Sequence, residues 1–163
     1  MSGSLPSVLA VRRSIYVEAP PDRVWREFET FERMSLWWGL TIGPPVAGSG
    51  NGQRLVRYEP RVGGRVEMEV LFGGAPMRYG GAIVVFDRGR ELTFESDWMP
   101  NQGWLRPTLI TFRLTPVLDG TLVELFHHGF ERTGGNAGDE LASYEGGWAM
   151  TQLVALRKLV AAA

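Results

Sequence analysis

The chain has 163 residues, and 44% of them are hydrophobic, which is enough to build the core of a single domain. Its 17 basic and 18 acidic residues leave a net charge of −1 without a basic run, which argues against nucleic acid as a partner. With no cysteine and two histidines, the chain excludes disulfides, thiolate chemistry and cysteine-ligated metals, so we expect neither a metal nor a cofactor.

The start of the chain, MSGSLPSVLA, has no basic residue ahead of its short apolar stretch, unlike an export signal. No apolar run approaches the roughly 20 residues that are needed to cross a bilayer. We therefore expect a cytoplasmic protein without a membrane span. Residues 1–7 are predicted to form a disordered leader and residues 8–163 a single domain.

The first predicted strand covers residues 8–18, where β-branched residues alternate roughly with polar ones. The proline and aspartate that follow favour a short helix over residues 21–28, and a second short helix is expected over residues 31–37. Residues 40–52 are rich in glycine and proline and predict a long loop, which we expect near the entrance of a binding site.

Short apolar runs separated by turn residues then predict an antiparallel meander. Its six strands are expected at residues 54–59, 65–72, 77–86, 91–98, 108–115 and 121–130. Near the end of the chain, helical spacing predicts one long helix, with a stripe of Leu141, Tyr144, Trp148, Gln152, Ala155 and Leu159. The expected fold class is α+β, a curved seven-stranded antiparallel sheet around a long C-terminal helix.

Several segments also follow one another in a familiar order: SIYVEAPPDRVWREF, FERMSLWWG, GGRVEMEV, GAIVVFDRGRELTFES, LITFRLTP, GTLVELFHHGF and YEGGWAMTQLVALRKL. Together they resemble the START-like helix-grip (SRPBCC) superfamily over residues 11–160. The branch is similar to the C-terminal domain of the Hsp90 ATPase activator, Aha1. The resemblance implies a sheet that grips a C-terminal helix around an apolar cavity, and many members have no assigned activity.

The inward faces of the predicted elements supply the candidate ligand contacts, because alternate residues of a strand share one face. The residues that we expect to bind a ligand are Trp37, Trp38, Met68, Val70, Phe72, Phe94, Trp98, Ile110, Phe112, His127, Tyr144, Trp148 and Gln152. The same set could fill a packed core, and the sequence leaves both arrangements open.

Two polar pairs have simpler explanations than catalysis. Glu67 and Glu69 occupy the face opposite that of the apolar residues on their strand, so we expect them to face water. His127 and His128 point to opposite faces and therefore do not form one metal site, and we expect His128 to be exposed. His127 is either a hydrogen-bonded structural histidine or a polar group at the cavity. No nucleotide-binding glycine motif or serine nucleophile elbow occurs.

The sequence thus predicts a protein that binds an apolar or amphipathic small molecule. One alternative is a cyclase-type or hydrolase-type enzyme in which His127 acts with Tyr79 or Asp97, although we assign no catalytic residue. Another alternative, implied by the resemblance, is a stress protein that acts as an Hsp90 co-chaperone. We do not expect that chaperone interaction, and we leave a homodimer open.

Overall fold

The computed structural model describes residues 9–38, 52–72, 75–145, 148 and 150–162. The described strands are β1 (Ala10–Val17), β2 (Gly52–Tyr58), β3 (Arg65–Phe72), β4 (Ala75–Asp87), β5 (Glu91–Met99), β6 (Thr108–Val117) and β7 (Gly120–His128). They form a seven-stranded sheet in which every neighbouring pair is antiparallel. The predicted fold class is confirmed. The predicted leader, and the predicted loop up to residue 51, lie outside the described residues.

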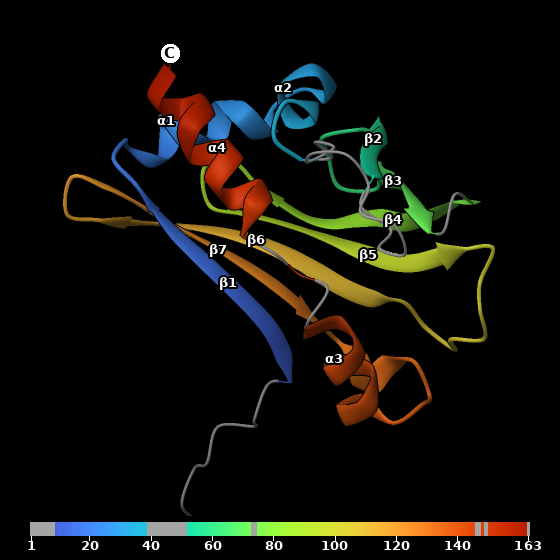
Figure 1. Cartoon of the computed structure of the whole chain (residues 1–163). Coiled ribbons are helices and arrows are strands. Elements are labelled where there is room, and N and C mark those ends of the chain that lie inside the picture. The colour runs from blue at the N-terminus through green and yellow to red at the C-terminus, as the bar shows by residue number, and fades with distance from the viewer. Residues whose placement is uncertain (1–8, 39–51, 73–74, 146–147, 149, 163) are drawn as a thin grey trace, which may run out of the picture.

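The first two strands lie at opposite edges of the sheet, whose order is β1-β7-β6-β5-β4-β3-β2. The chain therefore crosses the width of the sheet between β1 and β2. The described part of this crossing contains α1 (Pro21–Trp25), the 3-10 helix η1 (Arg26–Phe28) and α2 (Phe31–Ser35). Figure 1 shows α1, α2 and the C-terminal helix on the same side of the curled sheet.

The short helices begin where the sequence provides local start signals. Pro21 occupies the first turn of α1, where the missing N–H of proline costs nothing, and Asp22 complements the positive end of the helix. The Thr30 side chain caps α2 by accepting a hydrogen bond from the Arg33 backbone N–H at 3.1 Å. These helices bury Val24, Trp25, Phe28 and Met34 against the sheet.

The C-terminal helix is divided, where the sequence predicts one helix. α3 (Ala137–Glu145) and α4 (Thr151–Ala162) are separate, and the segment between them contains Gly146 and Gly147. Glycine costs about 1 kcal/mol more than alanine inside a helix, which explains why an unbroken helix is unfavourable here. α4 buries Gln152, Leu153, Leu156 and Val160, whereas α3 has no fully buried residue. The sheet therefore grips α4.

Strand alternation directs one set of side chains toward these helices. Leu92, Phe94 and Ser96 of β5 are buried. Glu95 and Asp97, which face the other way, are only partly buried. Among the described residues, none of the helices combines the length and the apolar character that would span a membrane.

Candidate ligand-binding site

An aromatic cluster connects α2 with the centre of the sheet. The ring of Phe112, on β6, lies edge-on to Trp37 and Trp38, with centroid distances of 5.4 and 5.0 Å. Phe28 packs against Trp37 at 4.9 Å, and the Trp37 indole N–H donates to the Glu27 backbone oxygen at 2.9 Å. Trp37, Trp38 and Phe112 have 0% exposure, so protein atoms cover these three predicted ligand residues completely.

Further predicted residues lie on the concave face of the sheet. Met68 and Val70 belong to β3, and Phe94 is the direct cross-strand partner of Ile110. Their exposed fractions are 4% for Val70 and 0% for the other three. Phe72 ends β3, and its side chain lies outside the described part of the structure. These packed side chains are available to a ligand only if their neighbours move.

A second group of predicted aromatic residues is half-buried. It consists of Trp98 on β5, Tyr144 on α3, and Trp148 between α3 and α4. The Trp98 indole N–H donates to the Tyr144 hydroxyl oxygen at 3.0 Å, and Trp148 packs against Trp38 at a centroid distance of 5.7 Å. Through the contact of Trp148 with Trp38, this half-buried group is continuous with the buried aromatic cluster.

His127 links two members of this group. Its ring contacts Tyr144 at a centroid distance of 4.8 Å and Trp148 at 5.7 Å. We call the continuous series of contacts formed by Tyr79, Trp98, Tyr144, His127, Trp148 and Trp38 the aromatic arc. The arc brings six residues from β4, β5, β7, α3 and the segments after α2 and α3 into one connected set.

The hydrogen bonds of His127 determine its tautomer. The Trp148 indole nitrogen is only a donor, so its 2.9 Å hydrogen bond makes Nδ1 of His127 an acceptor. Nε2 lies 2.8 Å from Oγ1 of Thr108, and Oγ1 of Thr108 donates to the Ser96 backbone oxygen at 2.9 Å. Nε2 must therefore carry the proton that it donates to Thr108. The imidazole is neutral, and both of its nitrogens are engaged.

Burial holds His127 in this neutral form. Desolvation, with a smaller contribution from His128, lowers the pKa of His127 to about 3. A neutral imidazole with both nitrogens bonded cannot exchange a proton with a substrate unless this chain of hydrogen bonds opens. The geometry thus favours the hydrogen-bonded structural histidine over the acid/base group of the enzyme alternative.

The other two residues of that alternative also have partners. The Tyr79 hydroxyl donates to the Gln53 side chain at 3.3 Å, and burial raises the pKa of Tyr79 above its ordinary range. The Asp97 carboxylate accepts from the Trp98 backbone N–H and from the Asn101 side chain, both at 2.7 Å. None of these contacts joins either residue to His127, so the structure gives no support to a catalytic group built from the three.

Gln152, the last predicted contact, is the second residue of α4 and lies on its buried face with 7% exposure. Its Oε1 atom has no hydrogen-bond partner, and the same is true of Nε1 of Trp38. A buried polar atom without a partner costs about 1–3 kcal/mol. These are unusual positions within the described part of the chain, where most buried polar groups are bonded.

Both polar pairs occupy the faces that strand alternation predicts. Glu67 and Glu69 are on the outer face of β3, where Glu69 forms an ion pair with Arg54 at 3.0 Å. His128, which we expect to be exposed, is half-buried and lies 2.9 Å from the Thr111 hydroxyl. The described residues contain no group of three histidine, cysteine or acidic side chains that could hold a metal ion.

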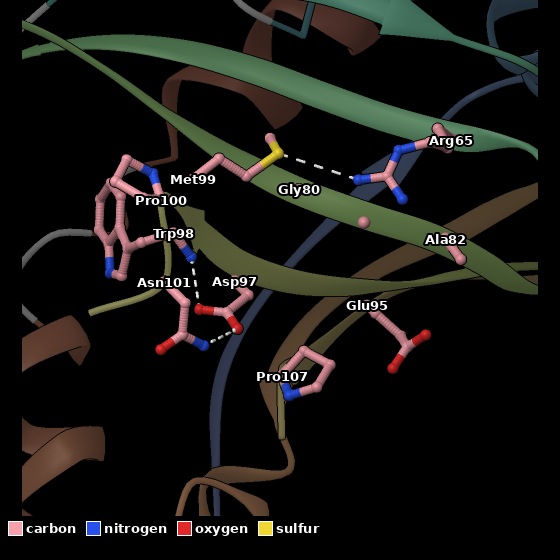
Figure 2. Close-up of a pocket in the computed structure, with 11 residues that line it drawn as sticks. Arg65, Gly80, Ala82, Glu95, Asp97, Trp98, Met99, Pro100, Asn101 and Pro107 are labelled. Atoms are coloured by element: carbon pink, nitrogen blue, oxygen red, sulfur yellow. Dashed lines mark hydrogen bonds between the residues drawn. The ribbon is translucent and has the colours of Figure 1, made fainter. Parts of the chain in front are cut away.

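A pocket of about 390 Å³ lies on the outer face of the sheet, away from the aromatic cluster, and the sequence did not predict it. Figure 2 shows the Arg65 side chain reaching across Gly80 toward the Met99 sulfur, at 3.8 Å. The pocket is lined by Arg65, Gly80, Gly81, Ala82, Glu95, Asp97, Trp98, Met99, Pro100, Asn101 and Pro107. Each oxygen of its Asp97 carboxylate accepts one hydrogen bond from within the protein.

Sequence reasoning missed two residues that organise the arc. Arg13 of β1 donates to the backbone oxygens of Trp148 and Glu145, at 3.1 and 2.7 Å. Thr108 bridges His127 and β5. An arginine and a threonine on strands carry no distinguishing local signal, and more than 130 residues separate Arg13 from its acceptors.

The fold has many solved relatives of low sequence identity. Protein CV1439 from Chromobacterium violaceum is 22% identical with a TM-score of 0.64, and the match covers 93% of this chain and 96% of that one. Protein Ms6760 from Mycobacterium smegmatis is 17% identical with a TM-score of 0.67, and the match covers 95% and 92%. The Aha1 dimer from Colwellia psychrerythraea, solved in solution, is 19% identical with a TM-score of 0.58, covering 93% and 95%.

No protein with a curated function matches the chain significantly. The family model that does match is described as "Activator of Hsp90 ATPase homolog 1-like protein", and it covers residues 18–161, nearly the whole described domain. The chain therefore belongs to the family of proteins that are similar to the activator of the Hsp90 ATPase.

Proposed function

We propose that this protein binds an apolar or amphipathic small molecule between the concave face of the sheet and α4. The observation that carries the proposal is the aromatic arc, in which the half-buried Trp98, Tyr144 and Trp148 lead inward to Trp38. Aromatic side chains with a few polar atoms are the usual lining of small-molecule sites. The proposed ligand first contacts the half-buried members of the aromatic arc. It contacts the packed residues only after the neighbouring side chains have moved.

The division of the C-terminal helix supports this assignment. α3 buries no residue completely, and it is attached to the sheet through Tyr144 and through the contact of Arg13 with Glu145. An element with little buried apolar surface opens at a lower free energy than the core. Movement of α3 would expose Trp98, Tyr144 and Trp148 to an incoming ligand.

Tryptophan fluorescence tests the proposal directly. We expect saturable binding of the uncharged dye N-phenyl-1-naphthylamine, displaced by an uncharged apolar competitor such as 2-naphthol. Trp148→Leu should weaken binding at least fivefold, whereas the matched control Phe126→Leu, at a half-buried position on the outer face of β7, should leave it unchanged. Linear, non-saturable dye uptake by the folded wild-type protein would refute the proposal.

Regulation of an Hsp90-type ATPase is the second candidate, and it is favoured by the description of the family. We expect no change in the ATPase rate of an Hsp90 homologue at tens of micromolar of this protein. A stimulation that persists in Trp148→Leu would place the function on the protein surface and make ligand binding incidental.

A further inference from the structure

Two buried polar atoms near the aromatic arc lack hydrogen-bond partners. They are the indole nitrogen Nε1 of Trp38, which can only donate, and the amide oxygen Oε1 of Gln152, which can only accept. Trp38 has 0% exposure and Gln152 has 7%. The described chain contains two other such atoms, in Trp25 and Glu27, and both belong to the first helical segment.

Both atoms belong to the proposed ligand site. Trp38 packs against Trp148 of the arc at a centroid distance of 5.7 Å. Gln152 follows Trp148 by four residues and lies on the face of α4 that also buries Leu153 and Leu156. Figure 1 shows α4 on the same side of the curled sheet as α1, and its buried leucines belong to the hydrophobic core.

The surroundings do not favour an ionised ligand. Among the buried polar side chains of the described chain, Glu27 is the only charged one, and Arg23 and Arg33 neutralise it. Desolvation lowers the pKa of His127 and raises the pKa of Tyr144, and both shifts indicate that this region disfavours charge. The Arg13 guanidinium directs donors to three backbone oxygens, those of Trp148, Arg12 and Glu145. No lysine or arginine is among the buried residues of the described chain, so a carboxylate would lose its hydration there without meeting a buried cation.

We propose, on the basis of the ligand-binding function above, that the ligand is uncharged and largely apolar and carries a hydroxyl group. Its O–H donates to Oε1 of Gln152, a buried acceptor that only a donor on the ligand can satisfy. The indole N–H of Trp38 is a buried donor that remains for an acceptor on the ligand. Gln152 is thus the residue that determines the preference for a hydroxyl group within an otherwise apolar site.

A matched series of ligands tests this inference. Calorimetric titration at pH 7.5 would compare 2-naphthol, 2-methoxynaphthalene and 2-naphthoate, which share one apolar body. We expect 2-naphthol to bind about tenfold more tightly than the ether, because the ether cannot donate a hydrogen bond. It should also bind at least tenfold more tightly than the carboxylate. Equal or tighter binding of the carboxylate would overturn the inference while leaving the ligand-binding function intact.

Substitution of Gln152 tests whether this residue recognises the hydroxyl group of the ligand. Gln152→Leu should reduce the preference for 2-naphthol over the ether to less than twofold, with little change in binding of the ether itself. The variant should fold and melt above the wild type, because it removes a buried polar atom without a partner. Gln152→Met provides a second apolar replacement of similar length.

The exposed Gln102, changed to leucine, is the matched control and should retain the full preference. An unchanged preference in both Gln152 variants would mean that another group recognises the hydroxyl, and the inference would be wrong. If the wild-type protein binds none of the three compounds, the proposed function fails as well.

Discussion

Burial keeps the imidazole of His127 neutral, so this side chain acts as a structural link and not as an acid or a base. His127 accepts from Trp148 and donates to Thr108, so it connects the segment between α3 and α4 to two strands. Protonation would place a hydrogen on Nδ1, which would then face the indole N–H of Trp148, so two donors would meet in a desolvated environment. The residue therefore stabilises the fold only while it is neutral.

This gives a prediction for the pH dependence of stability. The folded pKa of about 3 lies below the unfolded value near 6.5, so between these values the unfolded chain binds the extra proton. The free energy of unfolding should fall by about 1.4 kcal/mol for each pH unit below 6 because of this residue. Urea denaturation at pH 7 and pH 4.5 would measure the decrease.

His127→Gln should flatten that dependence. His128→Gln is the comparison variant: desolvation lowers the pKa of His128 as well, but this neighbour on the opposite face of β7 is only half-buried, so its removal should flatten the dependence less. If His127→Gln and the wild type lose the same free energy between pH 7 and pH 4.5, the buried imidazole is not the source.

Glu27 is a second residue whose burial determines its role. It has 0% exposure, and its Oε1 atom lies 2.8 Å from Arg23 and 2.6 Å from Arg33. Arg23 also donates to the backbone oxygen of Val160 in α4 at 3.3 Å. The carboxylate therefore holds α1, α2 and the C-terminal helix together.

Removing this charge should destabilise the protein strongly. Breaking a buried ion pair typically costs about 3–5 kcal/mol, so we expect Glu27→Gln to cost about 2–4 kcal/mol, because the amide oxygen keeps part of the hydrogen bonding. Glu32→Gln, at an exposed position of α2, should change stability by less than about 0.5 kcal/mol. Chemical denaturation of both variants is the measurement, and equal effects would contradict the role of burial.

At the scale of elements, β4 depends on a glycine. Gly80 has a φ of +146°, and a Cβ atom there would lie 1.9 Å from the Val66 backbone oxygen of the neighbouring strand. Backbone contacts of this kind cannot be relieved by rotating a side chain. The close approach of β3 and β4 therefore requires the absence of a side chain at this position.

We expect Gly80→Ala to destabilise the protein by more than about 3 kcal/mol, through both backbone strain and the contact with β3. Gly103→Ala is the matched control, because Gly103 also has a positive φ, +107°, but has open space around its Cβ position. The control should lose only about 1 kcal/mol. Thermal denaturation that shows similar losses would contradict a steric requirement at Gly80.

The whole molecule combines a well-buried core with one loosely attached helix. α4 and the sheet share a continuous hydrophobic core, whereas α3 touches the sheet mainly through Tyr144. Stability is rarely uniform when burial differs in this way. The aromatic arc lies where the loosely attached helix and the core meet.

Hydrogen exchange should show this difference. The backbone amides of α3 should exchange at least tenfold faster than those in the last two turns of α4 under native conditions, because α3 opens without unfolding the core. Saturating 2-naphthol should slow exchange in α3. Equal protection of both helices in the free protein would remove the opening step from the proposed function.

Much of the architecture follows from local patterns in the chain. The glycine-separated apolar runs predicted each strand of the meander to within a few residues, and Pro21 and Asp22 predicted the start of the first short helix. Alternation also separated Met68 and Val70 from Glu67 and Glu69. These features are local, because side-chain periodicity and capping act over a few residues.

The tertiary structure decided what each of these residues does. Helical periodicity cannot reveal that α3 and α4 are separate, since Tyr144, Trp148 and Gln152 keep the same spacing whether or not the helix is broken. The tautomer of His127 depends on Trp148 and Thr108, about 20 residues away on either side. Tryptophan packing, a buried carboxylate and amide atoms without partners arise from contacts between distant elements. The sequence by itself determined which side chains face the interior, and only their packing determined which are fully covered and which remain partly exposed.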